Sequence, residues 1–139
     1  MSSQALKDIV AALKSLIEGT KKFKAVYADR ELTSQQLAGH GLLPACVITE
    51  GPGTAGHYIT ETTAYVTYLN ARIYCSTGDD DARLLDEAIC DAVAGDVQLG
   101  GTCISCLAYS CDPPIQWPPN ENKLQVRDRM FIVTYWRDA

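Results

Sequence analysis

The chain has 139 residues, of which 47 % are hydrophobic and 21 % charged, a size and balance that suit one domain with one core. The net charge of -5 excludes a protein whose whole surface binds nucleic acid, because neutralising phosphates requires clustered Lys and Arg. No apolar stretch approaches the roughly 20 residues of a membrane helix, and the N-terminus lacks the pattern of a secretory signal. We therefore expect a single α+β domain over residues 1–139, made in the cytoplasm and not bound to a membrane.

The chain contains six cysteines, a number that would suit a disulfide framework in a secreted protein. The cytoplasm keeps thiols reduced. We therefore expect all six to be free thiols that pack as small hydrophobic side chains.

The first predicted element is an amphipathic helix over residues 3–18, which Gly19 can end. Its apolar stripe comprises Leu6, Ile9, Val10, Leu13, Leu16 and Ile17. A short strand should follow around residues 23–27, because Phe, Val and Tyr favour strands.

The next predicted elements are a polar loop over residues 29–43 and an apolar strand over residues 44–49. The Gly- and Pro-rich segment 51–56 should end that strand.

A long β-type segment over residues 58–75 is rich in Thr, Tyr, Val and Ile. Its alternation gives two faces. The face suited to a core carries Tyr65, Thr67, Leu69, Ala71, Ile73 and Cys75, and the other carries Val66, Tyr68, Asn70, Arg72 and Tyr74. Tyr, Arg and Asn on the second face fit a partner surface as well as a solvated one.

A second helix should begin after Thr77, which can cap it, and end near Gly95. The three acidic residues 79–81 lie where the helix dipole favours negative charge. The expected apolar stripe comprises Leu84, Leu85, Ala88, Ile89, Ala92 and Val93.

Two more strands are predicted, over residues 102–111 and 123–136, separated by the Pro-rich segment 112–120. Proline lacks the amide donor that a strand ladder needs, so this segment should be irregular. Apart from Thr134, the last strand is apolar on both faces over residues 130–136, which indicates a central strand. A bulge would explain the interruption at Asp128.

The element order α-β-β-β-α-β-β predicts an α+β fold. Hairpin-like loops should join adjacent strands into a largely antiparallel β-sheet, with two amphipathic helices packed on one face.

The glycines Gly51, Gly53 and Gly56 match G-x-G-x-x-G. A dinucleotide site requires this motif to open a helix, whose N-terminus binds the pyrophosphate. A β-type segment follows here, which favours a flexible hairpin loop.

Cys103 and Cys106 form a C-x-x-C pair. On a strand, positions three apart point to opposite faces, so the pair should pack structurally and bind no zinc.

His40 and His57 lie in Gly-rich loops, and no feature places a thiol beside either ring for nucleophilic catalysis. Consecutive residues at a helix start point in different directions, so 79–81 should not chelate a metal. We expect no catalytic residue, no cofactor and no metal site, and hence no enzyme.

Trp117 lies among prolines. A Trp held in such a loop could be a preorganised anchor for a partner, or it could fold back to cover its own core.

The sequence combines four features: the first helix, the run Pro44-Ala45-Cys46-Val47-Ile48, the strand end Ala71-Arg72-Ile73-Tyr74-Cys75 before an acidic turn, and the closing Phe131-Ile132-Val133-Thr134-Tyr135-Trp136. Together they resemble the tail-terminator (tail-completion) proteins of long-tailed bacteriophages, of the lambda type. The six cysteines and the Trp117 loop depart from that family's pattern.

The resemblance implies a homo-hexameric ring that caps the tail tube, stops its polymerisation and docks the neck or head-completion protein. DNA would pass through the pore without sequence-specific binding. The protein would assemble in the host cytoplasm and remain in the virion at the tail–neck junction. Contacts within such a ring join two unlike patches, and exposed loops often supply them. The residues expected at interfaces are Arg30, Glu31, Tyr58, Glu61, Arg72 and Trp117.

Two rival functions remain open. A head-completion or neck connector protein would have the same size and fold. A small cytoplasmic ligand-binding domain or enzyme would instead have a deep pocket near His57.

Overall fold

The computed structural model of the chain describes residues 4–28, 43–50, 57–58, 64–76, 82–111, 115–116 and 124–136. These residues form two helices, α1 (Gln4–Gly19) and α3 (Ala82–Ala94), and one mainly antiparallel sheet. The predicted α+β fold with the order α-β-β-β-α-β-β is confirmed.

The strand order across the sheet is β1-β2-β4-β7-β5, with β3 paired to β4 and β6 paired to β7. The strands are β1 (Ala25–Ala28), β2 (Ala45–Glu50), β3 (His57–Tyr58), β4 (Ala64–Ser76), β5 (Ser105–Cys111), β6 (Ile115–Gln116) and β7 (Leu124–Trp136). The two-residue strands β3 and β6 were not predicted separately. β6 lies within the Pro-rich segment, at two residues that are not proline and can therefore pair.

The long strands β4 and β7, 13 residues each, form the centre of the sheet. They pair antiparallel along their whole length, from Ala64 opposite Trp136 to Ser76 opposite Leu124. β7 also pairs with β5 on its other side, which confirms the prediction that the closing strand is central.

Two details of the predicted sheet are wrong. β1 and β2 pair in parallel, so no hairpin-like loop joins them. The bulge lies in β5, between Ala108 and Ser110, whereas the register between β4 and β7 runs without a break through Asp128. Asp128 interrupts the apolar pattern because it has polar partners on β4.

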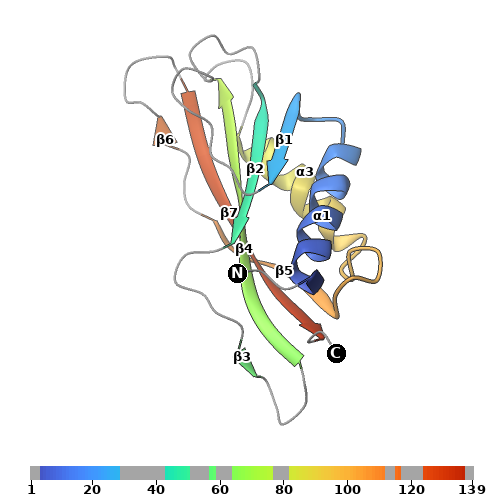
Figure 1. Cartoon of the computed structure of the whole chain (residues 1–139). Coiled ribbons are helices and arrows are strands. Elements are labelled where there is room, and N and C mark those ends of the chain that lie inside the picture. Colours follow the sequence, from blue (N-terminus) through green and yellow to red (C-terminus); the bar gives the residue numbers. More distant parts are fainter. Residues whose placement is uncertain are drawn as a thin grey trace.

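Both helices pack on the same face of the sheet (Figure 1). Helix α1 buries Leu6, Ile9, Val10, Leu13 and Ile17, each of which stabilises the fold by roughly 1.5–3 kcal/mol. They meet the predicted core face of β4, where Leu69, Ala71, Ile73 and Cys75 are buried in the same cluster.

Helix α3 departs from its predicted apolar stripe most clearly at Leu84 and Asp86, while Ala88 and Ala92 are only half-buried. Leu84 is 57 % exposed, while Asp86 is buried. The buried set is Ala82, Leu85, Asp86, Ile89 and Val93. The prediction assumed that a charged residue faces solvent, and it missed the partners that Asp86 finds on β7. Among the described residues, no helix is long and apolar enough to cross a membrane.

Candidate interaction surface

The face of the sheet opposite the helices, here called the outer face, carries the side chains that alternate with the core residues of β4 and β7. Because Leu69 and Ile73 of β4 and Phe131 of β7 point into the core, their neighbours in sequence point outwards. This outer face has three parts: an apolar cluster, a polar centre and an exposed apolar end.

An apolar cluster occupies the outer face beside β2. Its buried members are Leu43, Ala45, Val47, Tyr74 and Val126, with Ala25 and Tyr27 packed against them. Tyr74 is therefore neither solvated nor available to a partner. This part of the outer face serves the stability of the chain.

An ion pair between Arg72 of β4 and Asp128 of β7 forms the polar centre. Nε and Nη2 of Arg72 donate to the two carboxylate oxygens of Asp128 over 2.8 and 3.0 Å. Asn70 donates to the same carboxylate over 3.2 Å. Burial would raise the pKa of Asp128, but the hydrogen bonds from Arg72 and Asn70 and the charge of Arg72 outweigh it, so this pKa lies below its ordinary value. The two opposite charges neutralise each other on the outer face.

The exposed end of the outer face is apolar and aromatic. Leu107, Tyr109 and Trp136 are 51 %, 58 % and 60 % exposed. The register aligns Tyr68, Ile132 and Leu107 as one row across β4, β7 and β5, and the ring of Tyr109 lies 5.2 Å from that of Tyr68. Trp136 lies on the same face of β7, four positions beyond Ile132. We call Tyr68, Leu107, Tyr109, Ile132 and Trp136 the outer patch. Exposed apolar groups gathered in this way are typical of interaction sites.

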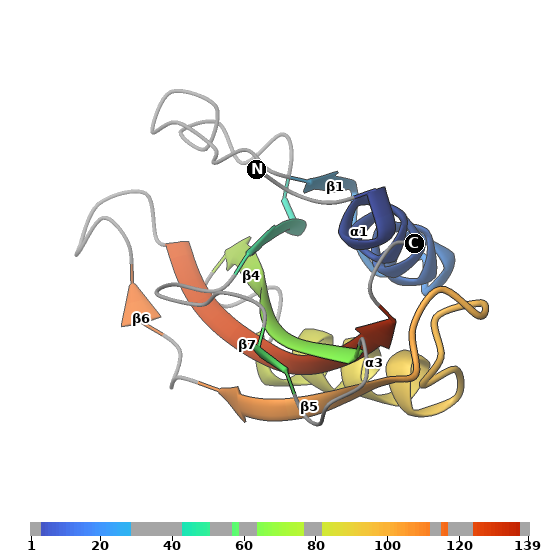
Figure 2. The same ribbon diagram turned by 60° about the horizontal axis from the view of Figure 1, so that its bottom comes forward.

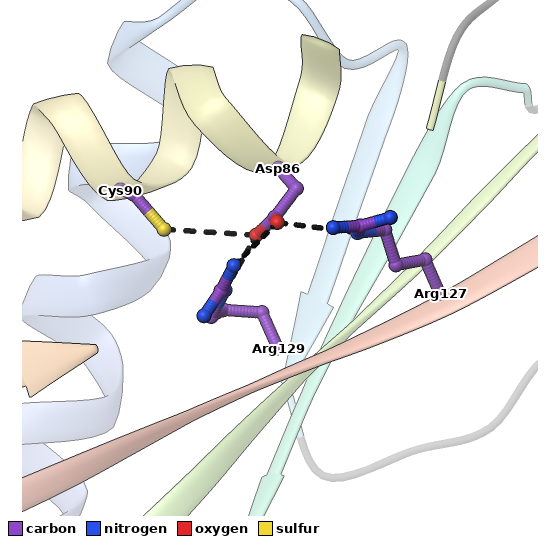
Figure 3. A network of polar contacts seen from close by, with 4 residues as sticks. All are labelled: Asp86, Cys90, Arg127 and Arg129. Atoms are coloured by element: carbon purple, nitrogen blue, oxygen red, sulfur yellow. Dashed lines mark hydrogen bonds and ion pairs between the residues drawn. The ribbon is translucent and has the colours of Figure 1, made fainter. Parts of the chain in front are cut away.

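A second polar network lies beneath α3, on the helix side of the sheet. The carboxylate of Asp86 is contacted by Arg127 and Arg129 of β7 and by the thiol of Cys90 (Figure 3). Arg129 donates two hydrogen bonds, and the carboxylate is only 2 % exposed. A buried carboxylate needs such partners, so this network attaches α3 to the centre of the sheet.

The two networks have a common origin in the sequence Arg127-Asp128-Arg129. Successive side chains of a strand point to opposite faces. Both arginines therefore reach Asp86 on the inner side, while Asp128 reaches Arg72 on the outer face. One short charged run thus supplies both faces of β7 with their ionic contacts.

Of the six residues predicted at interfaces, Arg72 is placed by the structure on the outer face, where it is bound to Asp128. Tyr58 belongs to β3, but the structure does not describe its side chain. Arg30, Glu31, Glu61 and Trp117 lie outside the described residues. Only Arg72 of these six has a described side chain, so their common location stays a prediction.

The thiols of Cys46, Cys75, Cys103 and Cys106 are free and buried, as predicted for packing residues. The reason given for separating Cys103 from Cys106 is wrong. β5 begins at Ser105, so Cys103 precedes the strand, and both thiols join the same core cluster. Burial raises the pKa of Cys103 to about 11 and that of Cys106 to about 12. Groups of acidic, Cys and His residues able to hold a metal are absent from the described part of the chain.

Several other predicted features lie outside the described residues. They are the glycines of the G-x-G-x-x-G motif, His40, the cap Thr77 and the acidic residues 79–81. His57 belongs to β3, but its side chain is likewise not described.

These observations define a two-layer α+β protein whose outer sheet face exposes an apolar patch beside a neutralised ion pair. No protein-family model matches the chain, and no curated protein matches its sequence.

Sequence reasoning missed Leu107, Tyr109 and Trp136. For Trp136 the signal was present, because residues 130–136 are apolar on both faces of the strand apart from Thr134. We interpreted that pattern only as a sign of a buried central strand. The outer face of a central strand can also bind a partner protein.

Proposed function

We propose that this chain is a structural assembly protein that acts by self-association, and that it is the tail terminator of a long-tailed bacteriophage. The observation that carries the proposal is the outer patch, with Leu107, Tyr109 and Trp136 all more than half exposed. A monomer gains nothing from exposing these side chains, whereas an assembled subunit buries them, at roughly 25 cal/mol per Å² of apolar surface.

The fold supports the more specific part of the proposal. The element order and the two-layer arrangement agree with what the resemblance to tail terminators implies. The copies would form a homo-hexameric ring on the end of the finished tail tube. One side of the ring matches the tube end, and the other side cannot template another tube subunit, so polymerisation stops.

The remaining partners follow from this role. The free side of the ring would dock the neck or head-completion protein, and DNA would pass through the pore without sequence-specific binding. The net charge of -5 is compatible with DNA that slides without adhering. The protein would assemble in the host cytoplasm and stay at the tail–neck junction of the virion.

Electron microscopy of a lysate tests the proposal, using a phage that carries this gene in disrupted form. Overlong tubes of variable length beside unjoined heads are the result expected. Tails of normal length beside unjoined heads would instead indicate a head-completion or neck connector protein. Normal infectious particles would contradict both functions.

Complementation of the disrupted gene tests the outer patch within the same experiment. Trp136→Glu should restore fewer infectious particles than the wild-type gene, because it places a charge in the patch. Leu84→Glu is the matched control, since Leu84 is similarly exposed but lies on α3 in the helix layer. Equal complementation by both variants would exclude the patch from the assembly contact.

A further inference from the structure

The turn between α1 and β1 carries a cluster of lysines. Lys21, Lys22 and Lys24 are all exposed, and we call their three side chains the lysine turn. It joins α1 to β1, which stands first in the strand order of the curved sheet (Figure 2). Residues 19–28 contain no acidic residue, so the net charge of -5 is the sum of +3 in this segment and -8 elsewhere. Positive charge is therefore concentrated at one place on an acidic protein.

The lysine turn has no counter-charge within the described part of the chain. None of its three ammonium groups forms an ion pair with a described carboxylate. Glu18, the acidic residue that precedes the turn, pairs with Lys14 on the same helix. Arg72 and Arg129, by contrast, are bound to carboxylates of the fold. The charge of the lysine turn is therefore available to an anionic partner.

Hydrogen bonds hold the backbone of the turn in place. The amide of Lys22 donates to Oγ1 of Thr20 over 3.3 Å, and the amide of Lys24 donates to the carbonyl of Pro44 over 2.7 Å. Phe23, which lies between these two lysines in the sequence, packs against the core. The lysine turn is thus presented from a fixed backbone, so less conformational entropy is lost when it binds.

The backbone of Lys21 gives a second indication that this charge serves a partner. Its φ is 57°, in the left-handed region that glycine adopts freely and that is unfavourable for a residue with a Cβ. The fold alone would favour glycine here, and residues held in such conformations cluster at functional sites. The dipole of α1 also favours cations near its C-terminus, but this effect falls off within the last turn of a helix. It does not account for Lys24, which lies beyond the end of α1 at Gly19.

We propose that the lysine turn contacts the phosphate backbone of DNA without reading its sequence. Clustered ammonium groups match a polyanion that carries one negative charge per roughly 1.7 Å of duplex, and phosphate contacts carry no sequence information. The net -8 of the remaining chain repels DNA, so the contact stays weak and local, and DNA can still slide. The choice of DNA among polyanions rests on the proposed function, in which DNA passes through the ring.

Fluorescence anisotropy of a labelled double-stranded DNA of mixed sequence, titrated with the purified full chain at several salt concentrations, measures this contact. We expect binding at low salt that does not depend on the sequence of the DNA. The logarithm of the affinity should fall linearly with the logarithm of the salt concentration, by about 0.9 per neutralised phosphate. A triple variant that combines Lys21→Gly, Lys22→Gln and Lys24→Gln should lose the binding.

The single variant Lys21→Gly separates binding from folding. It removes a charge together with the unfavourable backbone conformation, so the Tm should not fall. The salt dependence should become shallower by about 0.9 for each bound subunit. Lys7→Gln is the matched control, because Lys7 is exposed on α1 outside the turn and its loss changes the net charge by the same amount. This control should bind DNA as the wild type does.

The inference is overturned by a wild-type protein that does not bind DNA at low salt, or by a triple variant that binds as well as the wild type. An equal weakening by Lys7→Gln and Lys21→Gly would also overturn it, since net charge alone would then explain the binding. If poly-glutamate binds more tightly than DNA, the lysine turn fits an acidic protein, and the assignment to DNA is wrong. The proposed function stands in each of these cases, since micrographs of the disrupted phage decide it separately.

Discussion

Asp86 of helix α3 accepts two hydrogen bonds from the guanidinium of Arg129 on strand β7, over 2.7 and 2.6 Å. Arg127 donates to the same carboxylate over 3.1 Å. The two arginine side chains are 15 % and 17 % exposed. Three charged groups therefore lie between the layers of the protein, with the carboxylate of Asp86 bound by both guanidinium groups.

Replacing Asp86 should destabilise the fold more than replacing an exposed acid of the same helix. We expect Asp86→Asn to lower the free energy of unfolding by about 3–5 kcal/mol, because it removes the carboxylate charge that binds two largely buried guanidinium groups. Asp91→Asn is the matched control, since Asp91 is exposed on α3, and it should change stability by less than about 0.5 kcal/mol. Urea unfolding of both variants checks this. Equal losses of unfolding free energy in the two variants would mean that the contacts of Asp86 stabilise the fold no more than an exposed acid does.

The ion pair of Arg72 with Asp128 should make stability depend on pH in acid. The pKa of Asp128 is lowered in the fold, so its contribution is complete above the unfolded pKa of about 4 and is lost as the pH falls through the lower folded pKa. Asp128→Asn should cost on the order of 1 kcal/mol at pH 7, since the pair is partly exposed.

Urea unfolding of wild type and Asp128→Asn between pH 7 and pH 3 measures this contribution. The difference in stability between the two proteins should shrink as the solution becomes acidic. A difference that stays constant over this range would show that the charge of Asp128 does not stabilise the fold.

The parts of the fold that follow from local periodicity were predictable from the sequence. The apolar stripe of Leu6 to Ile17 predicts α1, and the alternation from Tyr65 to Cys75 predicts the core face of β4. These patterns need no knowledge of the neighbouring element, because 3.6-residue and two-residue periods are properties of one segment.

The parts that depend on distant partners were not predictable. Asp86 is buried because Arg127 and Arg129 lie opposite it, about 40 positions later in the chain. Asp128 can occupy a position in the middle of a strand because Arg72 of the neighbouring strand β4 donates hydrogen bonds to its carboxylate. The parallel pairing of β1 with β2 and the bulge in β5 likewise depend on which strands become neighbours.

The candidate site was predictable in part. The outer face of β4 was recognised, but its two ends differ, since Tyr74 is buried while Tyr68 adjoins the exposed Leu107 and Tyr109. A single strand cannot reveal this difference, because Tyr74 packs with Leu43, Ala45 and Val47 at one end. At the other end, β5 adds Leu107 and Tyr109.

Buried thiols should resist alkylation in the folded protein. Burial raises the pKa of Cys106 to about 12 and that of Cys46 further still, so almost no thiolate is present at pH 8. We expect iodoacetamide to modify both at least about a hundredfold more slowly in the native protein than in urea. Mass spectrometry of the labelled peptides checks this, with the partly exposed Cys90 as the internal comparison. Equal labelling with and without urea would contradict the burial.

Two glycines should respond in opposite directions to substitution by alanine. Gly101 has φ 89°, a conformation that L side chains rarely adopt, so Gly101→Ala should cost about 1–3 kcal/mol. Gly19 closes α1 with open space around it, so Gly19→Ala should stabilise by up to about 1 kcal/mol. Thermal unfolding should therefore show a lower Tm for the first variant and a higher Tm for the second. A higher Tm for both variants would mean that a side chain at position 101 does not strain the backbone.

The pairing of β4 with β7 also sets an order of events during synthesis. β4 ends at residue 76, but the strand that completes its pairing begins at residue 124. Until the ribosome has released residue 136, a long strand rich in Tyr, Val and Ile has no partner along one side. Until β7 is released, the nascent chain therefore carries an open template for misassembly.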